Sequence, residues 1–301
     1  MRWKPALQGA RGRETCTAAI TPFRPSEDLP ALLDTLRAHI ARLEKSGSQF
    51  EAHKAGAAPW LTGLAALDRH LPVQGLQRAG LHDVSPLASG DQPAAMGFAL
   101  ALALRRLADP QERRPLLWCR LAAQEREHGR LYGHGLERLG LSRQRFVMVS
   151  LRKSASLLWT MEEALKSGAV AAVLGDADTV QADLTVTRRL SLAAAAGKSA
   201  AILIFTRAGA SAAATASHTR WVAAAATSCS PPDDALAVGP PCWHIELIRA
   251  RGGRPGAWSL EWHHAQSRFS LVSGLSGGAL HPGADQGGPQ AAAQGPALRT
   301  G

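Results

Sequence analysis

A Gly-Lys-Ser tripeptide at positions 197–199 has the residues that end a nucleotide-binding phosphate loop. Such a loop follows a strand and precedes a helix, because the helix N-terminus and the loop N–H groups must face the phosphates. Here a helical run, Asp183–Ala196, comes first and an apolar strand, Ala200–Phe205, comes after. The full pattern G-x-x-x-x-G-K-S/T would also need a glycine at Leu192. We therefore predict that the glycine caps the C-terminus of a helix and that Lys198 lies near the negative end of its dipole.

The order that a phosphate loop requires occurs earlier, where an expected strand, Gly80–Val84, leads through SPLASGDQ into an expected helix, Pro93–Ala108. Gly90 is present in this turn, but Asp91 stands at the lysine position and Gln92 at the hydroxyl position. An aspartate repels a triphosphate, and an amide is a poorer Mg²⁺ ligand than a hydroxyl. The turn is therefore either a degenerate nucleotide site or an ordinary turn that never bound nucleotide. Its candidate cofactor-binding positions are Ser89, Gly90, Asp91 and Gln92.

Three arginines surround glycines in the segment RARGGRPG, between two expected strands. They are Arg249, Arg251 and Arg254. Guanidinium groups on a hairpin loop can bind phosphates, so this segment is a candidate nucleic-acid contact. The alternative is a solvated hairpin, because no aromatic residue is interleaved to stack on bases.

Neither a metal site nor a hydrolase nucleophile is predicted. The four cysteines contain no C-x-x-C pair, and the histidines lack the spacing of metal ligands. Ser150 and Ser191 do not stand in a G-x-S-x-G frame, so no hydrolase elbow is indicated at either. We therefore assign no catalytic residue and no metal ligand.

Strands and helices alternate from Trp60 onwards, which predicts a parallel sheet with right-handed crossovers. The expected strands are Gly80–Val84, Pro115–Arg120, Phe146–Leu151, Ala169–Gly175 and Ala200–Phe205. The expected helices are Pro93–Ala108, Gly129–Gly140, Ser154–Ser167 and Asp183–Ala196. Three further segments, TRWVAAAA, CWHIELIRA and GAWSLEWHH, predict an antiparallel extension of the sheet. The predicted fold class is α/β, a mostly parallel sheet flanked by helices with antiparallel strands added at the C-terminal end.

Composition divides the chain into three parts. Residues 1–58 are a basic N-terminal segment and linker, in which Leu29–Leu43 carries the apolar stripe of a helix. That helix either packs on its own domain or docks a partner. Residues 59–271 form the α/β domain. Residues 272–301 are rich in Gly, Pro and Ala without periodicity, and we expect them to be disordered.

The formal net charge of +10 suggests contact with nucleic acid, an acidic partner or an anionic surface. A composition rich in Ala, Arg and Gly explains the charge equally well. The basic N-terminus lacks the apolar core of a secretory signal, and no apolar run approaches the length of a membrane span. We expect a soluble cytoplasmic protein with no membrane partner.

The order of segments from Trp60 to about Ala225 resembles that of RecA-like proteins. SPLASGDQ lies where those proteins carry the Walker A loop, and EEALKSGAVAAVLGD resembles their Walker B region. The resemblance implies that Asp176 stands in the place of the Mg²⁺-assisting acid; the alternative is that it only caps or turns the loop. Glu125 and Glu127 lie near the expected catalytic glutamate, but charged residues of this kind are more typical of a solvated helix or loop.

Within that superfamily the closer resemblance is to the ImuA family. It is carried by LYGHGLERLGL, LLWTMEEALKSGAVAAVLGD, DLTVTRRLSLAAAAGKSAAILIFTR, TRWVAAA and HIELIRARGGRPGAWSLEW. The resemblance implies a role in error-prone translesion DNA synthesis and mutagenesis during the SOS response to DNA damage. It implies as partners ImuB, an inactive Y-family polymerase relative, and an error-prone replicative-type DNA polymerase. A RecA filament and DNA are further candidate partners.

We therefore predict a RecA-like accessory scaffold that is not an enzyme and has a degenerate Walker A loop. No cofactor is predicted, and binding of ATP with Mg²⁺ is disfavoured. One alternative is a DNA-dependent ATPase with a non-standard phosphate loop. The other is a cell-division inhibitor similar to SulA, to which ImuA-like chains have some resemblance.

Overall fold

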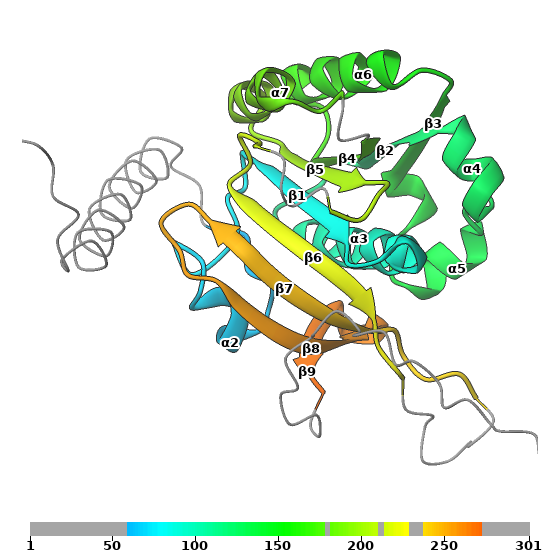
Figure 1. Ribbon diagram of the computed structural model, residues 1–301, viewed down its shortest axis with the longest axis vertical. Helices are drawn as coiled ribbons and strands as arrows, with labels where there is room; N and C mark the ends of the chain where they lie inside the picture. The colour runs from blue at the N-terminus through cyan, green and yellow to red at the C-terminus, as the bar shows by residue number, and fades with distance from the viewer. Residues whose placement is uncertain (1–58, 178–180, 210–213, 229–236, 273–301) are drawn as a thin grey trace, which may run out of the picture. The chain divides into compact units, whose positions relative to one another are not determined.

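The computed structural model describes residues 59–177, 181–209, 214–228 and 237–272, which are coloured in Figure 1. The N-terminal segment 1–58 with its predicted helix, and the predicted tail beyond Val272, lie outside the described residues and stay predictions. Within the described part, two groups of buried apolar side chains lie on the two faces of one sheet.

The described residues form a nine-stranded sheet in the order β3-β2-β4-β5-β1-β6-β7-β8-β9. All pairings from β3 to β6 are parallel, and those from β6 to β9 are antiparallel. This confirms the predicted fold class, with its antiparallel strands at the C-terminal end. The strands are β1 (Leu81–Pro86), β2 (Leu116–Leu121), β3 (Phe146–Leu151), β4 (Ala172–Ala177), β5 (Ala200–Phe205), β6 (Thr219–Ala225), β7 (Cys242–Ala250), β8 (Gly256–His263) and β9 (Arg268–Leu271).

The antiparallel extension begins one strand later than the sequence predicted. TRWVAAA forms β6, which runs parallel to β1, with Val84 in register with Trp221. The connection 206–218 is long enough to return the chain to the start of β1, as a parallel pairing requires. There the His218 N–H donates to the Leu81 carbonyl at 2.7 Å. β9 was not predicted, since its four residues carry too short a pattern.

Helices cover both faces of the parallel strands, with α6 and α7 on one side and α3 on the other (Figure 1). The predicted helix Gly129–Gly140 is wrong at its start, because residues 129–132 are not helical. Gly129, at φ +81°, instead ends an unpredicted helix, α4. The helices are α2 (Ala65–Asp68), α3 (Gln92–Leu107), α4 (Ala122–His128), α5 (Gly133–Arg138), α6 (Ser154–Ser167) and α7 (Leu184–Gly197).

Candidate functional site

The Gly-Lys-Ser tripeptide joins the end of α7 to the start of β5, so it has the reverse of phosphate-loop context. The left-handed residue that ends the helix is Lys198, at φ 52°, and not the glycine as predicted. Gly197 is needed for a different reason. A Cβ built there would lie 1.7 Å from the Leu165 carbonyl oxygen of α6. The glycine therefore serves the close approach of two helix ends.

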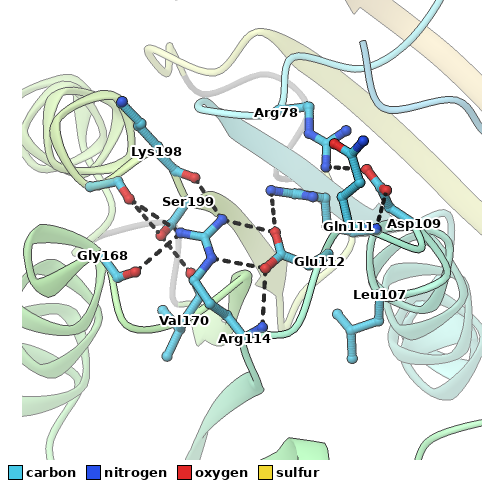
Figure 2. A network of polar contacts seen from close by, with 12 residues as sticks. Arg78, Leu107, Asp109, Gln111, Glu112, Arg114, Gly168, Val170, Lys198 and Ser199 are labelled. Atoms are coloured by element: carbon cyan, nitrogen blue, oxygen red, sulfur yellow. Dashed lines mark hydrogen bonds and ion pairs between the residues drawn. The ribbon is translucent and has the colours of Figure 1, made fainter. Parts of the chain in front are cut away.

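An arginine holds this corner together, as Figure 2 shows. Arg114 Nη1 donates to the Gly168 carbonyl at 3.1 Å, and its Nη2 donates to the Lys198 carbonyl at 3.1 Å. Glu112 in turn accepts two hydrogen bonds from the Arg114 guanidinium, at 2.9 and 2.8 Å. Carbonyls left without partners at helix C-termini attract such a cation. The tripeptide is thus part of a packing corner, with its carbonyls directed at a guanidinium.

The turn between β1 and α3 follows a strand and precedes a helix, the order that a phosphate loop requires, and it contains Asp91. Asp91 Oδ2 accepts from the Ala88 N–H at 3.1 Å, and Oδ1 accepts from the Ala225 N–H at 2.9 Å. The carboxylate thereby ties the turn to the end of β6. Because like charges repel, a carboxylate fixed in this turn opposes a triphosphate.

The neighbours of Asp91 also lack phosphate-loop chemistry. Gln92 begins α3 and is only 1% exposed, so its amide is withdrawn from the surface. Within the described residues neither of its amide atoms has a hydrogen-bond partner. Gly90 is exposed, and a Cβ built on it meets nothing within 4 Å. Ser89 is exposed as well. The fold itself therefore does not require a glycine at position 90.

Asp176 lies near the end of β4, where it contacts β2 and not the turn after β1. Its Oδ2 lies 3.5 Å from Arg120 Nε and accepts the Leu121 N–H at 3.1 Å. Both charged side chains are fully buried. Burial raises the pKa of Asp176, against the nearby Arg120 charge, which lowers it. In the described part of the chain, no hydrogen bond or ion pair joins Asp176 to residues 89–92. The reason is that β5 lies between β4, which carries Asp176, and β1, which leads into the turn.

The three arginines predicted to contact nucleic acid lie in different settings. Arg249 is inside β7, in register with Arg220 of β6, and not in the hairpin loop as expected. Arg251 Nη2 donates to the Ala216 carbonyl at 2.8 Å. Arg254 is exposed in the loop before β8. Their contact with phosphates stays a prediction.

The glutamates near the expected catalytic position both lie on α4. Glu125 Oε2 accepts a hydrogen bond from the Ser150 hydroxyl at 3.0 Å, and Glu127 is exposed. No group of three or more His, Cys, Asp or Glu side chains among the described residues is placed to hold a metal ion.

An exposed sheet edge is a feature that the sequence analysis missed. Among the described strands, β3 pairs with β2 alone and forms one edge of the sheet. Its Val147 is 47% exposed and its Met148 is 39% exposed. An apolar edge strand offers unpaired backbone groups to a partner strand. Its sequence, FVMVSL, is typical of an ordinary buried strand, and only its position at the edge, among the described strands, distinguishes it.

The fold and the site together define an α/β protein with a strand–turn–helix that lacks the lysine and hydroxyl of a phosphate loop. No protein-family model matches the chain. Protein ImuA of Caulobacter vibrioides (strain NA1000 / CB15N) is 34% identical over 225 residues, which cover 71% of this chain and 88% of that relative. The ImuA protein of a second Caulobacter vibrioides strain gives the same values. The chain belongs to the ImuA family.

Two further findings complete the comparison. The crystal structure of SulA from Pseudomonas aeruginosa is 25% identical and covers 42% of this chain and 97% of that chain. The TM-score of this match is 0.33. Among the described residues, no helix is both long and apolar enough to cross a membrane.

Proposed function

We propose that this protein is an accessory, non-polymerase component of error-prone translesion DNA synthesis, and that it acts by binding partners without hydrolysing ATP. Membership of the ImuA family supports a role in the DNA damage-inducible mutagenesis system. The observation that carries the second half of the proposal is the carboxylate of Asp91, held by two backbone N–H groups in the turn between β1 and α3. It puts negative charge where a nucleotide site needs positive charge.

The partners that the ImuA resemblance implies are an ImuB-type inactive polymerase relative and an error-prone replicative-type polymerase. A scaffold needs surfaces that can bind such proteins. The β3 edge, with Val147 and Met148 exposed, is one such surface in the described part of the chain. Strand addition at an open edge supplies backbone hydrogen bonds, and the exposed side chains supply specificity.

The first experiment measures equilibrium binding of a fluorescent ATP analogue with Mg²⁺ to the full chain, with and without single-stranded DNA. We expect no saturable binding at high micromolar protein, because the turn offers phosphates no cation. The variant compared with the full chain is Asp176→Asn, checked for its fold by near-UV circular dichroism. Suppose that binding is saturable, that unlabelled ATP competes it away and that Asp176→Asn abolishes it. That result would favour the alternative function, a DNA-dependent ATPase with a non-standard phosphate loop.

The second experiment tests the partner surface with the ImuB-type relative. Val147→Lys places a charge on the exposed β3 edge, and we expect it to weaken binding about tenfold, as loss of an interface contact does. Leu271→Lys, on β9 at the opposite edge, is the matched control, since Leu271 is 44% exposed. Unaltered affinity in the Val147 variant, or an equal loss in both variants, would exclude the β3 edge as the docking surface.

A further inference from the structure

A pocket of about 640 Å³ opens beside α4, at the carboxyl ends of β2 and β3. Its charged lining comes from two separate stretches of chain: Arg126 and Arg130 after β2, and Arg152 directly after β3. The remaining lining residues are Ala122, Ala123 and Glu125. The nucleotide-site prediction named none of these three arginines. Arg130 also lines a second cavity, which includes Pro93 and Met96 near the start of α3.

The three guanidinium groups are unpaired within the described residues. In the described part of the chain, none of Arg126, Arg130 and Arg152 makes a side-chain hydrogen bond or ion pair. Other arginines of this protein do, such as Arg114, Arg120 and Arg145. Each of the three pocket arginines is also exposed. Their donors are therefore available to an anion from solution.

The acid in the pocket does not neutralise the arginines. Glu125 Oε2 accepts the Ser150 hydroxyl, and the carboxylate makes no ion pair with the three arginines in the described residues. Three positive charges against one negative leave the lining with an excess of positive charge. Guanidinium groups match phosphate oxygens in geometry and stay charged at any physiological pH.

An exposed aromatic ring close to Arg130 in the sequence suits nucleobases. Tyr132 follows Arg130 by two residues and is 70% exposed, with its ring tilted by 59° to that of His134 at a centroid distance of 5.4 Å. Arg130 also lines a second cavity of about 250 Å³ with an apolar wall that includes Leu100, Trp118 and Leu131. Proteins that bind single strands combine arginines, which contact phosphates, with exposed aromatic rings, which stack on bases. An acidic peptide would use the arginines but not the ring.

We propose that Arg126, Arg130 and Arg152 form a binding site for the phosphodiester backbone of single-stranded nucleic acid, with Tyr132 stacking on a base. The inference is independent of the proposed accessory role, because a scaffold needs no nucleic-acid site of its own. It also differs from the hairpin prediction of Arg249, Arg251 and Arg254, of which Arg251 is bonded to the Ala216 carbonyl.

The test measures fluorescence anisotropy of a labelled oligothymidine with the full chain over a series of salt concentrations. The variant combines Arg126→Gln, Arg130→Gln and Arg152→Gln. We expect it to bind about tenfold more weakly at low salt and to reduce the slope of log affinity against log salt by about 2, from three phosphate contacts on a single strand.

A charge-matched control separates a site from general attraction to a basic protein. It combines Arg113→Gln, Arg188→Gln and Arg268→Gln, three exposed arginines elsewhere on the chain. We expect this control to retain nearly all of the affinity. Equal losses in both triple variants, or no binding by the unaltered protein, would overturn the proposal.

Two more arms identify the ligand. Tyr132→Ala is expected to weaken oligothymidine binding about fivefold or more, while Tyr132→Phe retains it, because stacking needs the ring and not the hydroxyl. An abasic strand of the same length should bind both Tyr132 variants and the unaltered protein alike. If polyglutamate competes as well as oligothymidine and Tyr132→Ala has no effect, the site takes an acidic peptide and the nucleic-acid assignment fails.

Discussion

Glu112 is the residue at which the side chains of Arg106 and Arg114 converge. It is 6% exposed, and its Oε2 lies 2.7 Å from Arg106 Nη2 and 2.8 Å from Arg114 Nη2. Burial alone would raise the pKa of this carboxyl. Hydrogen bonds from Arg114 and the charges of Arg106 and Arg114 outweigh burial and lower the pKa to about 2.

The low pKa of Glu112 makes the stability of the protein depend on pH. Because its folded pKa lies below its ordinary value of 4.5, its contribution is complete above about pH 4.5 and is lost as the pH falls towards 2. We expect Glu112→Gln to lower the free energy of unfolding at neutral pH by about 3 kcal/mol, since two guanidinium groups lose their counter-charge. The variant should also flatten the pH dependence between 4.5 and 2.

Urea unfolding across that pH range measures both effects. Glu163→Gln is the matched control, because Glu163 is 47% exposed and, within the described part of the chain, pairs with Lys166 alone on the surface of α6. Such an exposed pair contributes little to stability. A Glu112→Gln variant as stable as the control would show that Arg106 and Arg114 are held by other contacts.

At the scale of elements, the ends of α6 and α7 meet where the Gly-Lys-Ser tripeptide lies. Gly168 ends α6 in the left-handed conformation at φ 65°, and Gly197 ends α7 directly against the Leu165 carbonyl. The amino-acid requirement at Gly197 comes from this approach of two backbones. Packing of the two helix ends therefore explains the glycine of a tripeptide that, in the sequence, resembles part of a nucleotide-binding loop.

Gly197→Ala tests this explanation. The added methyl would overlap the Leu165 carbonyl oxygen, a backbone atom that cannot turn aside, so α6 and α7 must separate. We expect a loss of about 2–3 kcal/mol in the free energy of unfolding, typical of overpacking. Gly90→Ala is the matched control, with a change of about 0.5 kcal/mol or less, because a Cβ there meets nothing within 4 Å. Equal effects of the two substitutions in urea unfolding would contradict the packing account.

At the scale of the whole molecule, both groups of buried apolar residues fall between Trp60 and Phe269. We therefore expect a chain of residues 59–272 to fold as the full chain does, with a Tm within about 3 °C of it. Thermal unfolding followed by near-UV circular dichroism measures this. A broad transition or a lost near-UV signal in the shortened chain would show that the domain bounds are wrong.

A comparison of particle sizes tests the predicted helix at Leu29–Leu43 as an assembly element. If it links copies of the chain, light scattering will give a larger particle for the full chain than for a third protein that lacks only residues 1–55, in units of whole subunits. An unchanged number of subunits would contradict a role of this helix in assembly.

Much of the fold could be predicted from local patterns. The strands at 146–151 and 200–205 and the helix at 154–167 have the predicted bounds. Each depends on apolar periodicity and on capping residues within its own length. The α4 helix and β9 were missed because each is short, and the helix expected from Gly129 began too early because a glycine at positive φ interrupts it.

By itself, the sequence determined that this is an α/β chain, that Asp91 and Gln92 stand where a phosphate loop would have its lysine and hydroxyl, and that a helix ends near Gly197. These are properties of neighbours along the chain. Only the tertiary structure decided that β6 runs parallel to β1, that Asp176 pairs with Arg120, and that three unpaired arginines line one pocket. Those contacts join residues far apart in sequence, so they depend on strand order and register, which local periodicity does not encode.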